Sequence, residues 1–227
     1  MSPQVSHVIF CYTLALSMQP SMAAMTAHQQ LVLASGNRKK IHELQQLLGK
    51  CGYDILPQSA FNTPEAEENG LSFVENAIIK ARNACRYSGL PAVADDSGLE
   101  VDALKGKPGI YSARFAGPDA SDQHNNQLLL DQLRDTTESE RTARFQCLLV
   151  YMRHAEDPTP IICQGTWEGR ILLAPEGNHG FGYDPLFYVP NHHCSSAQLA
   201  PELKNAISHR GQAMQKLLSY FSQTVTS

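Results

Sequence analysis

Apolar residues recur along most of the chain with the two periods that strands and helices require. Buried strands are predicted at residues 30–35, 53–57, 90–94, 99–104, 142–155, 160–169 and 185–189, with 142–155 and 160–169 forming a hairpin. Helical spacing is found at residues 38–48, 72–89, 120–133 and 202–221, and the last of these is interrupted near residue 208. Strands and helices alternate early and longer strands come late. The pattern therefore predicts an α/β fold with a central mixed β-sheet flanked by helices.

The most unusual point in this pattern is the pair Asp95–Asp96, which stands between two strand-like segments in the stretch "ADDSG". Adjacent carboxylates repel each other, and burying either one without a partner is costly. We therefore expect a positively charged group close to this pair. A turn between the two strands, stabilised by the aspartate side chains, is the structural alternative.

No internal repeat, charge block or low-complexity stretch interrupts the chain, which predicts a single domain over residues 26–227. Residues 1–25 are predicted to be an extension that is disordered or that precedes the true start at Met25. Their apolar run is too short to span a bilayer, and no Lys or Arg precedes it as in a signal peptide. A targeting segment remains the alternative.

The composition narrows the classes of function. With 227 residues, 42% of them hydrophobic, and a formal net charge of −4, the chain lacks the basic surface that nucleic acids or anionic membranes attract. We expect neither partner, so an anionic ligand must be held by local groups. The six cysteines include no C-x-x-C pair and are predicted to be reduced thiols of a cytoplasmic protein.

The stretch "SGNRKK" at residues 35–40 is the first candidate binding segment. It leads from a strand through a glycine turn into a helix N-terminus, where free N–H groups and the helix dipole favour an anion. No P-loop motif occurs in the chain. Lysines in a first helical turn are unfavourable, so Lys39 or Lys40 is interpreted as held by a ligand, with a solvated lysine as the alternative.

The acidic segment "EAEENG" at residues 65–70 is the second candidate. Glu67 or Glu68 could join Asp95 and Asp96 in a site for Mg²⁺, which binds one or two carboxylates together with waters and phosphates. One aspartate could then bind the metal while the other takes a proton from water. A solvated loop is the alternative.

The third and fourth candidates are "HGFGYDP" at residues 179–185 and "SHRG" at residues 208–211. In the first, Phe181 and Tyr183 offer faces on which a planar ring can stack, and Asp184 could accept hydrogen bonds from its edge. In the second, His209 and Arg210 stand near a helix start, where a cation needs a compensating anion. A glycine-rich hairpin and an exposed helix junction are the alternatives. The run "NHHCSS" at residues 191–196 is interpreted as a surface loop, because nearly consecutive ligands suit a zinc site poorly.

Together these segments supply cations for phosphates, carboxylates for a metal, a spare base and a platform for a planar ring. That combination indicates a nucleoside triphosphate site built for metal-assisted attack by water. The stretches "SGNRKK", "EENG", "FVENAIIKAR", "ADDSGLEVDAL", "PGIYSARFAG", "GFGYDPLF" and "KNAISHRG" also occur in one order over residues 31–221. In this the chain closely resembles the inosine triphosphate pyrophosphatase family.

The resemblance implies hydrolysis of ITP, dITP and XTP to the monophosphate and pyrophosphate, with Mg²⁺ as cofactor, by a cytoplasmic homodimer that removes damaged purines. It implies a two-lobed fold with a cleft between the lobes. At the matching positions it implies that Glu68 and Asp95 bind the metal and that Asp96 activates water. The substrate-binding residues that it implies are Ser35, Gly36, Asn37, Lys40, Lys80, Ser97, Phe181, Gly182, Tyr183, Asp184, Lys204, His209 and Arg210.

One segment departs from the family pattern. Where relatives commonly have "GKT-x-AE", residues 192–199 read "HHCSSAQL", with Cys194 and Gln198 in place of a lysine and a glutamate, so the contacts of this loop stay open. A pyrophosphatase of related fold for pyrimidine or methylated nucleotides is one alternative function. A nucleotide-binding module without catalysis is the other, although it would not need a spare carboxylate.

Overall fold

The computed structural model describes residues 29–37, 40–42, 44–45 and 53–224 of the chain. The predicted extension at residues 1–25 lies outside this part, as does much of the helix predicted at 38–48, of which 40–42 and 44–45 are helical. Within the described residues, no helix is both long enough and apolar enough to cross a membrane.

In the part of the chain that the structure describes, seven strands form one mixed sheet in the order β2-β1-β3-β4-β5-β6-β7, which confirms the predicted fold class. Strand β1 pairs in parallel with β2 and β3, whereas the pairs from β3 to β7 are antiparallel. The longest strands, β4 and β5, form the predicted hairpin. The strands are β1 (Gln29–Ala34), β2 (Tyr53–Pro57), β3 (Ala92–Val101), β4 (Thr142–Met152), β5 (Ile161–Ile171), β6 (Phe187–Val189) and β7 (Cys194–Ser195).

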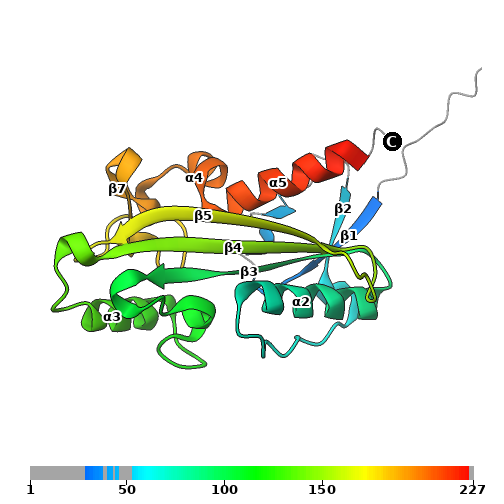
Figure 1. Cartoon of the computed structure of the whole chain (residues 1–227), viewed down its shortest axis with the longest axis horizontal. Coiled ribbons are helices and arrows are strands. Elements are labelled where there is room, and N and C mark those ends of the chain that lie inside the picture. Colours follow the sequence, from blue (N-terminus) through cyan, green and yellow to red (C-terminus); the bar gives the residue numbers. More distant parts are fainter. Residues whose placement is uncertain (1–28, 38–39, 43, 46–52, 225–227) are drawn as a thin grey trace, which may run out of the picture.

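Helices cover both faces of this sheet (Figure 1). One face carries α2 (Phe73–Ser88) and α3 (Asp122–Gln132), and the other carries α4 (Pro201–Ile207) and α5 (His209–Thr224). The ends of α2 lie where its sequence predicts them, with the Ser72 side chain accepting from the Glu75 N–H and Gly89 in the left-handed region at φ 69°. The predicted interruption near residue 208 is also confirmed, because Ser208 separates α4 from α5.

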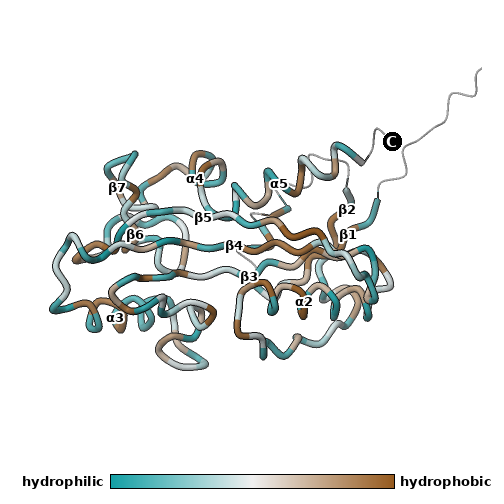
Figure 2. Tube along the Cα trace, in the orientation of Figure 1, coloured by the Kyte–Doolittle hydropathy of each residue, from teal (hydrophilic) through white to brown (hydrophobic). Residues whose placement is uncertain are grey.

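The core lies between the sheet and these helices. Alternate residues of β4 serve the two faces: Leu148 and Val150 pack beneath α2, whereas Cys147 and Leu149 pack beneath α5. Figure 2 shows the resulting concentration of apolar residues in the central strands.

Strand β3 differs from its prediction. The sequence indicates two strands on either side of Asp95–Asp96, but the structure has one unbroken strand that pairs with β4 from Ala92↔Met152 to Val101↔Ala143. The turn is unnecessary because cations outside the sheet, Lys40 for Asp95 and Lys80 of α2 for Asp96, pair with the two carboxylates. Since side chains alternate along a strand, the two aspartates must point to opposite faces.

Gly98 completes the close packing around β3. A Cβ atom at this position would lie 2.4 Å from the Gly109 carbonyl oxygen and 2.5 Å from Ser112 Oγ. Only glycine therefore lets the 3₁₀ helix Gly109–Arg114 pack directly on the strand.

Candidate active site

Two adjoining cavities form one cleft beside β3, because both are lined by Asn37, Lys40, Ser97 and Ala113. We call one the acidic half; its lining includes Ser35, Gly36, Glu65, Glu68, Lys80, Asp95 and Asp96. We call the other the aromatic half; its lining includes Ser112, Phe145, Phe181, Gly182, Tyr183, Asp184, Lys204, His209 and Arg210. Every site residue implied by the family resemblance therefore lines this cleft, whereas Glu67, the alternative to Glu68, lines neither cavity, and Lys39 lies outside the described residues.

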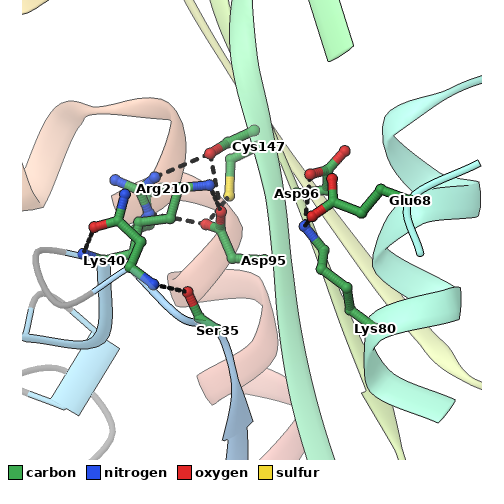
Figure 3. A network of polar contacts seen from close by, with 10 residues as sticks. Ser35, Lys40, Glu68, Lys80, Asp95, Asp96, Cys147 and Arg210 are labelled. Carbon is green, nitrogen blue, oxygen red and sulfur yellow. Dashed lines mark hydrogen bonds and ion pairs between the residues drawn. The ribbon is translucent and has the colours of Figure 1, made fainter. Parts of the chain in front are cut away.

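Asp95 and Asp96 point away from each other on the two sides of β3 (Figure 3). Asp96 Oδ1 lies 2.6 Å from Lys80 Nζ, which is also 3.5 Å from Glu68 Oε1. Asp95 lies on the other side with Lys40 and Arg210. The sequence prediction paired Glu68 with Asp95 at one metal, but here Glu68 shares a lysine with Asp96.

Asp95 is fully buried and accepts from donors on several elements. Its Oδ1 accepts from Lys40 Nζ at 2.6 Å and from Ser97 Oγ at 2.9 Å. Its Oδ2 accepts from Arg210 Nε at 2.8 Å and from Cys147 Sγ at 3.3 Å. Burial alone would raise the pKa of Asp95, but Arg210 and Lys40 outweigh it and hold the pKa well below its ordinary value. Asp95 is therefore a carboxylate anion at neutral pH.

Asp96 has a different environment. Its Oδ2 is buried and has no hydrogen-bond partner among the residues that the structure describes. Burial raises the pKa of Asp96, and Lys80 offsets this only in part. The pKa of Lys80 is also raised, since the attraction of Asp96 and Glu68 outweighs the effect of its burial. The site thus holds a carboxylate with an unused oxygen and increased affinity for a proton, which suits a general base.

The loop that carries Glu68 is held by the first turns of α2. Asn76 Oδ1 accepts from the Gly70 N–H at 2.9 Å, and Glu75 Oε2 accepts from the Leu71 N–H at 2.9 Å. Gly70 itself has no room for a side chain, because a Cβ would lie 2.6 Å from that of Glu75. The motif "FVENA" therefore positions the loop as well as the helix.

The turn after β1 presents backbone groups to the acidic half. Ser35 Oγ accepts from the Asn37 N–H at 3.1 Å, and Asn37 Oδ1 accepts from the Lys40 N–H at 3.3 Å. These bonds bring Lys40 back toward Asp95, so the predicted anion-binding turn and the carboxylate pair lie in one cavity.

In the aromatic half, the buried Asp184 carboxylate accepts hydrogen bonds from three residues. Its Oδ2 accepts from Lys204 Nζ at 2.6 Å and from the Phe181 N–H at 2.8 Å, and its Oδ1 accepts from Ser196 Oγ at 2.6 Å. The Phe181 ring lies beside two cations, with its centroid 5.2 Å from Lys204 Nζ and 5.8 Å from the Arg210 guanidinium carbon. The Asp184 carboxylate thus orients the predicted ring platform.

Tyr183 differs from Phe181 in exposure. It belongs to the hydrophobic core, and its hydroxyl donates to the Ser112 carbonyl at 2.8 Å. Of the two aromatic residues predicted for stacking, Tyr183 mainly fixes the loop.

His209 and Arg210 begin α5 directly on the sheet. The His209 ring stacks on Phe145, with centroids 4.7 Å apart and an interplanar angle of 14°. Its Nδ1 is buried and lacks a hydrogen-bond partner within the described part of the chain. Burial, reinforced by the charge of Arg210, holds the pKa of His209 well below its ordinary value, so the imidazole is neutral. In the neutral imidazole, one ring nitrogen can donate a hydrogen bond and the other can accept one.

Gly165 on β5 permits this close approach. A Cβ there would lie 2.0 Å from the His209 carbonyl oxygen and 2.8 Å from the Ala213 nitrogen. The first turn of α5 therefore rests on the bare backbone of β5.

The sequence reasoning missed several supporting residues, namely Asn76, Ser112, Phe145, Cys147 and Ser196. The period of two in "FQCLLVYM" places Phe145 and Cys147 on the same face of a strand, so the sequence alone could have predicted that these two residues lie together. The others are ordinary polar residues whose partners are set by the tertiary fold.

The atypical loop at residues 192–199 is closely tied to the cleft. Gln198 Oε1 accepts from the Ser195 N–H at 2.8 Å and completes a capping box, so glutamine here does the work of a glutamate. The next residue, Ser196, supports Asp184. Cys194 packs against the core rather than into the cleft.

Comparisons with known proteins identify the family of the chain. The model of the Ham1 family matches residues 31–220. A dITP/XTP pyrophosphatase of Vibrio cholerae is 56% identical over 198 residues, covering 87% of this chain and 99% of the relative. One from Shigella flexneri is 57% identical over 190 residues, covering 84% and 96%. Among solved structures, a HAM1 protein from Coxiella burnetii is similar with a TM-score of 0.81 and 48% identity, covering 86% of this chain and 99% of that one. The Ham1 protein of Staphylococcus aureus has a TM-score of 0.78 at 38% identity, covering 86% and 100%.

Proposed function

The chain belongs to the Ham1 family, and we propose that it hydrolyses the non-standard purine nucleotides dITP, ITP and XTP to the monophosphate and pyrophosphate. Relatives named dITP/XTP pyrophosphatase that are more than half identical support this activity. The continuous cleft supports it independently, because it joins a cavity with cations and carboxylates to one with an aromatic platform.

The observation that carries the proposal is the buried, unpartnered Oδ2 of Asp96 in the acidic half. A buried acceptor without a donor costs stability, unless a ligand or water uses it in the working enzyme. We propose that this oxygen takes the proton of the attacking water. Lys80, bonded to Oδ1, keeps the carboxylate oriented and partly offsets the effect of burial.

The acidic half also fits Mg²⁺. Mg²⁺ binds one or two carboxylates together with waters and substrate phosphates, so it needs no larger cluster of protein ligands. Glu68 and Asp96 Oδ1 converge on one cation, Lys80 Nζ. We propose Glu68 and this oxygen of Asp96 as the protein ligands, which leaves Asp96 Oδ2 to the attacking water. Bound there, Mg²⁺ would neutralise negative charge on the phosphate oxygens.

The phosphates are proposed to meet the turn of Ser35, Gly36 and Asn37 together with the amines of Lys40 and Lys80. The base is proposed to stack on Phe181, whose ring is open to the aromatic half. Arg210 and neutral His209 are proposed to read its edge. A donor such as Arg210 favours the 6-keto group of hypoxanthine or xanthine over the 6-amino group of adenine.

Lys204, Ser97, Gly182, Tyr183 and Asp184 complete the proposed substrate site. Asp184 pairs with the buried Lys204 and accepts from the Phe181 N–H, so this pair holds the loop that carries Phe181. Lys204 also places a positive charge beside the face of the Phe181 ring. From the family resemblance we further propose that residues 26–227 act as a single domain, in a cytoplasmic homodimer.

Product analysis tests the proposal. The purified chain is given dITP, ITP, XTP, GTP, ATP and dCTP, each with Mg²⁺ and again with EDTA, and pyrophosphate and phosphate are measured separately. We expect Mg²⁺-dependent pyrophosphate from the first three nucleotides and little from the others. Cleavage of dCTP alone would point to the pyrimidine enzyme class, and binding without cleavage would point to a nucleotide-binding module. Release of phosphate in place of pyrophosphate would contradict the proposed bond cleavage.

A further inference from the structure

We propose that Asp95 is a positioning residue that holds the base-reading Arg210 and the phosphate-side Lys40 in one fixed relation, and that it binds no metal ion. This inference rests on the proposed function, since it assigns work to groups that contact the substrate. Asp95 belongs to the acidic pair that the sequence singled out, yet its neighbour Asp96 lies on the opposite side of β3 (Figure 3).

The first argument is the use of both Asp95 oxygens. Lys40 Nζ is 2.6 Å from Oδ1, and Arg210 Nε is 2.8 Å from Oδ2, so each oxygen is committed to one cation. Ser97 Oγ donates to Oδ1 and accepts from Arg210 Nη2 at 3.0 Å, which closes a ring of bonds around the carboxylate. Cys147 adds a fourth donor from β4. A metal ion could reach Asp95 only by displacing these partners.

The second argument is burial. The Asp95 side chain is fully buried and that of Arg210 is 4% exposed. Removing the carboxylate from a guanidinium this deeply buried is strongly unfavourable, whereas Glu68 is 31% exposed and can approach an ion freely. The cost of changing partners therefore favours metal binding on the Glu68 and Asp96 side of the strand.

The third argument is location. Lys40 lines both cavities, and Arg210 lines the aromatic half beside Phe181. The two cations come from segments that are 170 positions apart in the chain, residues 40 and 210, and Asp95 is the common anchor between them. One carboxylate thus fixes the separation between a phosphate-binding group and a base-reading group. That separation determines whether both ends of a nucleotide fit at once.

The electrostatics agree with the same role. Lys40 and Arg210 carry two positive charges and Asp95 carries one negative charge, so the trio keeps a net positive charge for an anionic substrate. The Cys147 thiol stays protonated, because burial raises its pKa well above the ordinary value, and it can keep donating to Asp95. A positioning role requires that the charges of these groups stay constant, whereas a general base has to gain and lose a proton.

The test separates base reading from metal binding with the full chain. Asp95→Asn keeps the shape of the side chain and removes its charge. It is compared with Arg210→Gln, with the double variant, and with Glu68→Gln as the matched carboxylate control on the other side of β3. The first readout is the ratio of kcat/KM for ITP to that for ATP. The second is the affinity for Mn²⁺, which is measured from the EPR signal of the free ion in the presence of saturating α,β-methylene-ITP.

We expect Asp95→Asn to lower the ITP/ATP ratio by about tenfold to a hundredfold, as for a lost hydrogen bond to a charged group. The double variant should lower it no further than Arg210→Gln alone, because both changes disable one unit. Mn²⁺ affinity should stay within about twofold in Asp95→Asn and fall at least about tenfold in Glu68→Gln. A fall in Mn²⁺ affinity in Asp95→Asn that matches Glu68→Gln would overturn the proposal, as would effects that multiply in the double variant.

A second variant covers the case in which Asp95→Asn does not fold. Ser97→Ala leaves every charge in place but removes the hydroxyl that links Asp95 to Arg210. We expect a fewfold lower ITP/ATP ratio with unchanged Mn²⁺ affinity, and an unchanged ratio would refute the proposal. The wild-type chain in the same assay reports on the proposed function separately, since its failure to release pyrophosphate would overturn that function alone.

Discussion

The close backbone contact between Gly165 and the first turn of α5 should be sensitive to substitution, because it positions His209 and Arg210 in the cleft. Gly165→Ala adds one methyl group whose carbon would lie 2.0 Å from the His209 carbonyl oxygen. Ordinary van der Waals contact begins near 3.4 Å, so the two backbones must separate by about 1.4 Å. At this point β5 is paired with β4, through Gly165↔Cys147, within a long antiparallel register, and hence we expect the helix start to be the part that moves.

The size of the effect follows from this displacement. A misplacement of about 1 Å in a catalytic site can cost about 100-fold in rate. Forcing an extra methyl group into a packed core typically costs about 1–3 kcal/mol of unfolding free energy. We therefore expect Gly165→Ala to lose about 100-fold in kcat/KM for dITP, to lose preference for 6-keto purines, and to unfold at lower urea concentration.

The assay uses steady-state pyrophosphate release and urea unfolding, with Gln164→Ala as the control. Gln164 precedes Gly165 in β5, and its exposed side chain points to the opposite face, where it donates to Gln146 Oε1 at 3.3 Å, so its replacement should leave both measurements near wild type. If Gly165→Ala had wild-type kcat/KM and base preference, the position of the α5 start would not matter, and the reasoning would be refuted.

Three further predictions concern Asp96, Asn76 and His209. Asp96→Asn should reduce single-turnover pyrophosphate release by about 10²–10⁴-fold while nucleotide binding persists, as for loss of a general base; near-normal release would remove Asp96 from the chemistry. Because burial raises the pKa of Asp96 in the free protein, the acidic limb of the wild-type kcat/KM profile, which reports on the free enzyme, should lie above the ordinary aspartate value of about 3.9, and kcat/KM should fall as the pH is lowered through it. Asn76→Ala frees the Gly70 N–H and should raise the Mg²⁺ concentration for half-maximal activity severalfold, whereas exposed Gln123→Ala should not; equal values would show that the loop does not need this bond. Finally, the pKa of His209 is lowered in the folded state, so below about pH 6.5 the unfolded state binds more protons than the folded state. The unfolding free energy should therefore decrease as the pH is lowered, by up to about 1.4 kcal/mol per pH unit, and His209→Gln should reduce this slope in urea titrations. An unchanged slope would contradict a neutral His209.

The fold could be predicted largely from local pattern. The capped ends of α2 and the break before α5 depend on short-range chemistry that the sequence displays directly, namely a serine with a following glutamate, and glycine or serine at a helix end. The long hairpin of β4 and β5 follows from two adjacent apolar runs. In each case the determining interactions are close in sequence.

The continuity of β3 could not be predicted in the same way. Two adjacent carboxylates indicate a turn when only local propensity is considered. Their partners, Lys40 and Arg210 for Asp95 and Lys80 for Asp96, come from distant segments, and only these ion pairs make a buried strand acceptable. The sequence predicts that positive charge lies near the two carboxylates, but it does not predict that the cations approach from opposite faces of the strand.

Candidate residues of the site could be gathered from their motifs, because each motif concentrates unusual polar groups. Their individual orientation could not. Asp184 was expected at the edge of a bound ring, yet it faces Lys204 and Ser196, since the loop around residues 192–199 folds over it. Likewise, only the packing of α5 on β5 brings His209 against Phe145.

The alternation along β3 has a consequence for how this segment can change during evolution. Asp95 and Asp96 are neighbours in sequence but bind separate cations, Lys40 and Arg210 for Asp95 and Lys80 for Asp96, and this separation depends on the pleat of one strand. Replacing either residue would disrupt one set of ion pairs and leave the other formed. Inserting or deleting one residue between Ala92 and Asp95 would slip the register and turn every following side chain to the other face. An insertion would put Ala94 in the position of Asp95 and Asp95 in the position of Asp96, and a deletion would put Asp96 and Ser97 there. Either change would leave one set of cations without its carboxylate, so the length of this stretch should be inherited more strictly than its composition.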